Sequence, residues 1–114
     1  MNNCTYNLRR GNQQYQAIVD RITDRLNMSH IEVFEADTQN ACATLFKNGG
    51  NDSGKPIISY NPSFIQHVQA ANPWAMYFIF AHEVAHHYNH DLHGAFLSNL
   101  YGFDRRSHKN ELNA

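Results

Sequence analysis

The sequence lacks the features that mark several common classes of protein. Its longest apolar run, Trp74 to Ala81, is far shorter than the ~20 residues that a membrane-spanning helix needs. Residues 1–30 contain no continuous apolar segment, so no signal peptide is expected. The nine Lys and Arg are scattered and the formal net charge is −1, which argues against binding of nucleic acid. We expect no membrane span and a soluble chain. The compartment is not determined but leans towards the cytoplasm, and the sequence is silent on oligomeric state.

Cysteine is also scarce. Cys4 and Cys42 lie far apart and do not form a C-x-x-C motif, so two reduced thiols are favoured over a disulfide. The 114 residues suffice for one domain, and 42% hydrophobic with 17% charged residues is a globular composition. We expect a polar N-terminal segment at 1–12 and a single domain at 13–114.

The spacing of apolar residues predicts an α+β fold. An amphipathic helix is expected at 13–27. Alternation and composition predict three strands, of which the last two form a hairpin around a glycine-rich loop: 31–36, 41–46 and 56–60.

Two further helices have the same start signal, an asparagine N-cap followed by proline: Asn61-Pro62 and Asn72-Pro73. The first helix is expected to end near Ala71. The second is apolar nearly all round, so we expect it to be buried at the centre of the domain. After Asn89 the pattern weakens, and a short helix or ordered loop at 94–101 and a last helix at 108–114 are expected.

Histidine is abundant, with eight residues, most of them between His82 and His93. His82-Glu83-Val84-Ala85-His86 is an H-E-x-x-H motif. Residues four apart share one face of a helix, so His82 and His86 can bind one Zn²⁺ together. The carboxylate of Glu83 can act as a general base towards a metal-activated water.

A catalytic zinc site needs a third protein ligand. The metzincin pattern would place glycine and histidine where this chain has Asn89 and Leu92, so that class is excluded. His90 and His93 remain candidates, although they share the helix of His86 or its end. Glu111 is the better candidate, because a later helix can pack across the first and add a carboxylate to two imidazoles.

Three stretches together resemble the gluzincin metallopeptidases. They are Ile58 to Ile65, Ile79 to His87, and the Glu111-Leu112-Asn113-Ala114 stretch, which is similar to the E-L-x-A-D signature. The likeness covers roughly residues 31–114. It is greatest to the group related to CAAX prenyl endopeptidases and membrane-bound heat-shock zinc proteases, and to the soluble minigluzincins. The aspartate of the signature would follow Ala114, and the membrane helices of many relatives are absent.

The resemblance implies a zincin-like fold, in which a small three-stranded sheet, with its edge strand over the cleft, packs on a central H-E-x-x-H helix. It implies a zinc-dependent endopeptidase that acts on a peptide or unfolded protein, with Glu83 as general base. The implied functional residues are the zinc ligands His82, His86 and Glu111; the substrate-aligning strand residues Ala43, Thr44 and Leu45; and the candidate oxyanion stabilisers Tyr101, His108 and Tyr60.

The alternative is a non-catalytic or latent zinc-binding scaffold or regulatory domain. In that case His87, His90 or His93 would complete a closed four-ligand site. Folding of such a domain should depend on the metal.

Overall fold

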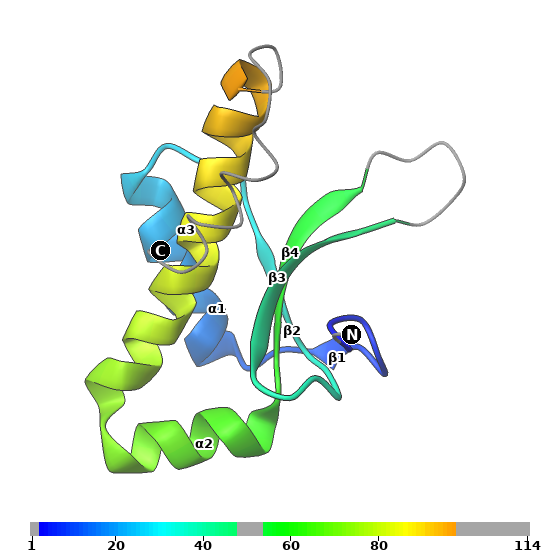
Figure 1. The fold of residues 1–114 in the computed structure, drawn as a ribbon. Coiled ribbons are helices and arrows are strands. Elements are labelled where there is room, and N and C mark those ends of the chain that lie inside the picture. Colours follow the sequence, from blue (N-terminus) through cyan, green and yellow to red (C-terminus); the bar gives the residue numbers. More distant parts are fainter. Residues whose placement is uncertain (1–2, 48–53, 98–114) are drawn as a thin grey trace.

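A computed structural model describes residues 3–47 and 54–97, with the side chains of the last helix described as far as Asn89. The fold is α+β, as predicted, with a mixed sheet and three helices (Figure 1). The elements in chain order are β1 (Arg9–Arg10), α1 (Gln13–Arg25), β2 (Glu32–Glu35), β3 (Ala41–Phe46), β4 (Lys55–Tyr60), α2 (Pro62–Ala71) and α3 (Pro73–Leu97).

The sheet has the order β1-β2-β4-β3. β3 and β4 form the expected antiparallel hairpin, β2 runs parallel to β4, and β3 lies at an edge. The prediction of three strands is wrong, because β1 adds a fourth at the opposite edge. Arg9–Arg10 has no apolar alternation to reveal a strand. Its pairing with Phe34 and Glu35, helped by the Arg9–Glu35 ion pair at 3.5 Å, arises only in the folded chain.

The three helices lie on one side of the sheet, and the N-terminal segment lies on the other (Figure 1). α3 packs against α1, α2 and β3. Both predicted asparagine caps are present: the side chain of Asn61 accepts from the backbone N–H of Phe64 at 3.0 Å, and that of Asn72 from Trp74 at 2.9 Å. Both helices therefore begin where the sequence predicts.

The core is centred on three aromatic side chains from three elements. Tyr15 on α1, Tyr60 on β4 and Phe80 on α3 have ring centroids 5.2 to 5.8 Å apart. The backbone N–H of Asn12 donates to the Tyr60 hydroxyl at 2.9 Å, and that hydroxyl donates to Glu35 at 3.4 Å. Burial raises the pKa of Tyr60 to about 12 despite the bond from Asn12. The hydroxyl therefore stays neutral and joins the core to the start of α1.

α3 is not buried all round, and this expectation is wrong. Met76, Phe80 and Val84 face the core, whereas Trp74 is 76% exposed and Phe78 is 75% exposed. Because α3 covers one side of the sheet, only one face of this helix contacts α1, α2 and β3. The helix also continues to Leu97, so no break occurs after Asn89 or before 94. The helix predicted at 108–114 lies outside the described residues.

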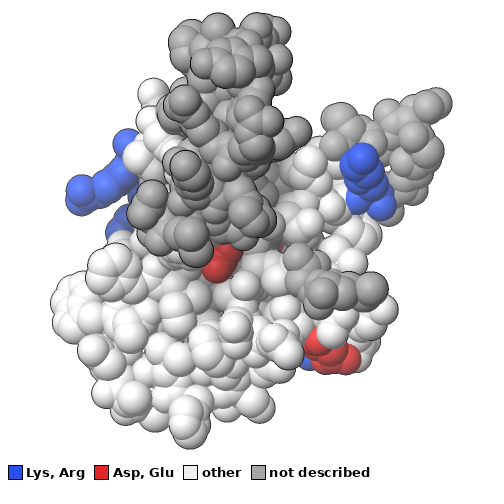
Figure 2. Space-filling model, in the orientation of Figure 1, with Lys and Arg blue, Asp and Glu red and all other residues white. Residues whose placement is uncertain are grey.

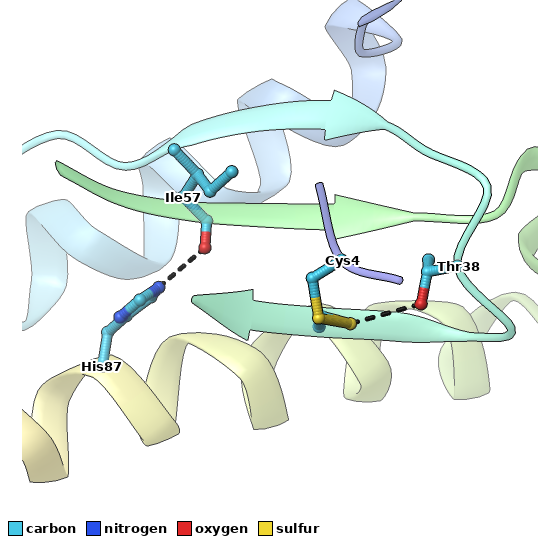
Figure 3. Close-up of a disulfide and its surroundings, with 5 residues drawn as sticks. Cys4, Thr38, Ile57 and His87 are labelled. Atoms are coloured by element: carbon cyan, nitrogen blue, oxygen red, sulfur yellow. Dashed lines mark hydrogen bonds between the residues drawn. A yellow bond between two sulfur atoms is a disulfide. The ribbon is translucent and has the colours of Figure 1, made fainter. Parts of the chain in front are cut away.

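Cys4 and Cys42 form a disulfide, with Cα atoms 5.7 Å apart (Figure 3). The prediction of two reduced thiols is therefore wrong. The fold brings the N-terminal segment against β3, and a separation of 38 residues carries no local pattern that reveals such a contact. Disulfides persist mainly in oxidising compartments, so this bond does not support the cytoplasmic leaning. Among the helices of residues 3–47 and 54–97, none is long and apolar enough to cross a membrane.

Reducing the disulfide should lower the free energy of unfolding by about 4 kcal/mol, because the bond closes a long loop and restricts the unfolded chain. Denaturant unfolding with and without a phosphine reductant measures this loss. The double variant Cys4→Ser with Cys42→Ser should unfold like the reduced protein and should not respond to the reductant. An unchanged unfolding midpoint after complete reduction would contradict the prediction.

Candidate functional site on helix α3

His82 and His86 lie one turn apart on α3 and present their ring nitrogens to each other. The two Nε2 atoms are 3.0 Å apart, and the ring planes are perpendicular. A tetrahedral zinc ion with Zn–N bonds of ~2.0–2.1 Å holds two nitrogen ligands about 3.3 Å apart. Both side chains are only half-buried. The pair can therefore supply two of the ligands of one zinc ion once the two rings move slightly apart.

A complete metal site is not present in the part of the chain that the structure describes. There, no group of three or more His, Cys, Asp or Glu could hold a metal ion. The expectation of a gluzincin-type, zincin-like metal-binding group is therefore wrong for the described residues, which bring only two possible zinc ligands together. One helix face supplies two ligands at this spacing, and a third must come from another element. Glu111 lies outside the described residues.

Glu83 follows His82 directly on the helix and is buried, with 8% of its surface exposed. Its neighbours in the helix include Val84, which is fully buried in the core. Glu83 is therefore adjacent to His82 in the helix, and its side chain is largely shielded from water. The three residues of the motif lie within two turns of α3.

His87 points to the sheet. Its Nε2 donates to the backbone carbonyl of Ile57 on β4 at 2.8 Å (Figure 3), and the residue is buried. This buried imidazole therefore has a hydrogen-bond partner within the fold. The bond ties α3 to the interior strand β4.

Replacing His87 by alanine should therefore lower the free energy of unfolding by about 1–3 kcal/mol, since a buried hydrogen bond to the sheet is lost. Thermal or denaturant unfolding measures the effect. His67→Ala is a matched control, because His67 is exposed on α2 and its loss should change stability little. Equal losses in the two variants would show that the bond to Ile57 contributes nothing.

The remaining predicted residues are placed as follows. Ala43, Thr44 and Leu45 lie on the edge strand β3, which packs against α3. The hydroxyl of Tyr60 is engaged within the core by Asn12 and Glu35. His90 and His93 lie in the last part of α3, whose side chains are not described; Tyr101 and His108 lie outside the described residues.

The sequence does not reveal two features of the molecule, the disulfide and the exposed face of α3. Trp74 and Phe78 are four apart, on a different face of α3 from Met76, Phe80 and Val84. A helical projection separates the two sets, but both are apolar, so it does not show which of them is buried.

Fold and site together define a small α+β domain with a mixed four-stranded sheet and a long helix that carries an H-E-x-x-H motif. Comparisons with family models, with curated proteins and with solved structures gave no match.

Proposed function

We propose that this chain is a zinc-dependent endopeptidase in which His82 and His86 hold the metal and Glu83 is the general base. The observation that carries the proposal is the 3.0 Å separation of the two Nε2 atoms, together with the burial of Glu83, which follows His82 in the helix. Glu111 is proposed as the third ligand, supported by the resemblance to gluzincins and by the chemistry of a carboxylate with two imidazoles.

In the proposed hydrolysis, the zinc ligands and Glu83 have separate roles. Zinc in such a site supplies Lewis-acid polarisation and activates water for attack on a peptide carbonyl. The carboxylate of Glu83 takes the proton from the attacking water and then gives it to the nitrogen of the leaving amine. Glu83 follows His82 on a helix that His87 anchors to the sheet, and this bond limits the movement of the helix segment that carries the motif.

The edge strand β3 can orient the substrate. It pairs with β4 on one side, and the other side has no neighbouring strand among the described residues. An extended peptide can add there as a further strand, with its backbone bonded to Ala43, Thr44 and Leu45. Because β3 packs against α3, such a peptide would run close to the helix that carries the motif. An extended or unfolded segment is thus the proposed substrate.

The test measures zinc stoichiometry and affinity by competition with a chelator, together with cleavage of an unfolded protein. The wild type should bind one zinc ion, and His86→Gln or Glu111→Gln should lower the affinity by about ten-fold or more. His67→Gln, a change at an exposed histidine of α2, should leave it unchanged.

Absence of zinc binding by the wild type would overturn the proposal. Full affinity in Glu111→Gln would show that the third ligand is wrong. Zinc binding without cleavage would favour the non-catalytic scaffold.

A further inference from the structure

The surface over α2 and the first turns of α3 carries no charged side chain and exposes large aromatic residues among neutral polar ones. Residues 56–82 contain no Lys, Arg, Asp or Glu. On the face drawn in Figure 2, the surface over these elements is free of both charge colours. Figure 1 places them at one corner of the molecule, on the other side of the sheet from the N-terminal segment. A charge-free corner of this extent is unusual in a chain that carries nineteen Lys, Arg, Asp and Glu, nine basic and ten acidic.

Two large aromatic side chains project from this corner. Trp74 and Phe78 lie one turn apart on α3 and are 76% and 75% exposed. The ring of Tyr77 lies beside that of Trp74, with centroids 6.2 Å apart. Both exposed residues belong to well-formed helix, since the N-terminus of α3 is capped by Asn72. The helix therefore presents them rigidly, and their exposure does not come from a loose loop.

The size of the patch argues against a second protein surface as the partner. Two aromatic side chains exposed to this degree offer on the order of 300 Å². A stable protein interface buries about 800 Å² on each partner and combines an apolar centre with a polar rim that fixes its register. Residues 56–82 supply no charged side chain that could steer a protein partner or fix its register.

The interfacial region of a lipid bilayer has different requirements. It accepts Trp, Tyr and Phe at the level of the headgroups, needs no complementary shape, and is entered by the apolar face of a helix while charged side chains stay on the polar face. The corner satisfies each of these conditions. With a formal net charge of −1 for the whole chain, electrostatic attraction to anionic lipid is not part of the interaction.

We propose that Trp74 and Phe78 form a peripheral docking site that inserts into the interface of an electrically neutral lipid bilayer. The site does not depend on the zinc-dependent activity proposed above. It attaches the corner formed by α2 and the start of α3 to the membrane surface and leaves the sheet in water. His82 continues the line of Trp74 and Phe78 at the same four-residue spacing, so docking brings the H-E-x-x-H segment close to the membrane.

The sequence provides its own reporter, because Trp74 is the single tryptophan. With phosphatidylcholine vesicles, its emission should shift to shorter wavelength, and lipids brominated on the acyl chain should quench it. Adding phosphatidylserine to the vesicles, or raising the salt concentration, should leave the partition coefficient unchanged. Without vesicles, acrylamide should quench Trp74 efficiently and the chain should sediment as a monomer.

Phe78→Ser, which retains the reporter, should lower the partition coefficient roughly ten-fold, because most of a phenylalanine side chain no longer enters the interface. Trp74→Ser, followed by flotation of protein with vesicles, should lower it at least as much. Tyr6→Ser is the matched control, because Tyr6 is an exposed aromatic residue on the N-terminal segment, and it should change partition less than two-fold. Circular dichroism confirms that each variant is folded.

Three results would overturn the proposal. The first is an unchanged Trp74 emission in phosphatidylcholine vesicles. The second is binding that requires phosphatidylserine and disappears with salt, which would indicate electrostatic adsorption. The third is a dimer in the absence of lipid in which Trp74 resists acrylamide, which would make a second copy of the chain the partner of this surface.

Discussion

Replacing Glu83 by glutamine is expected to lower the rate of peptide hydrolysis by about 10²–10⁴-fold, the usual contribution of a general acid–base group. Glutamine keeps the size and shape of the side chain but cannot take a proton from water. Because Glu83 is not one of the proposed ligands, zinc affinity should stay the same. Cleavage of a fluorescent unfolded substrate and zinc competition, measured on the same preparation, separate the two effects.

The control for this variant is Glu32→Gln, which removes an exposed carboxylate on β2 and should leave activity and stability unchanged. A rate within a few-fold of the wild type in Glu83→Gln would exclude Glu83 as the base. Loss of zinc together with loss of activity would instead show that Glu83 supports the metal site, and the proposed division of roles on α3 would be wrong.

Replacing Phe80 by alanine should cost about 3–5 kcal/mol in the free energy of unfolding, because a fully buried ring is lost and a cavity remains. Phe80 contacts both other rings of the aromatic core, Tyr15 and Tyr60. For a domain whose total stability is typically 5–15 kcal/mol, such a loss is a large fraction. Urea unfolding followed by circular dichroism measures it.

Phe78→Ala is the matched control, with the same change of side chain two residues earlier on the same helix. Phe78 is 75% exposed, so its replacement should change stability by no more than about 0.5 kcal/mol. The two variants thus compare the buried and exposed faces of α3 directly. Similar losses in both would mean that the exposed aromatic surface is covered in solution.

Much of the fold could be predicted from local signals. Helix α1, the hairpin of β3 and β4, and the starts of α2 and α3 all have causes within a few residues: apolar spacing, a glycine-rich connection, and the caps Asn61 and Asn72. β1 could not be predicted, because Arg9–Arg10 becomes a strand only where β2 offers free backbone groups.

The candidate site was predictable to the extent that it lies on one helix. The i, i+4 spacing of His82 and His86 places their rings side by side on one face of α3, with the two Nε2 atoms 3.0 Å apart. The separate role of His87 also follows from its position one residue along, which turns its side chain towards the sheet, but its acceptor, the carbonyl of Ile57, could be identified only from the structure.

The sequence by itself determined the helical segments, their caps and the pairing of two histidines with a glutamate, because these depend on residues close together in the chain. Only the tertiary structure decided which face of α3 is buried, which strand lies at each edge of the sheet, and that Cys4 is bonded to Cys42. Such contacts join residues that are distant in the chain. They depend on how the helices and the N-terminal segment pack on the sheet, which no local pattern encodes.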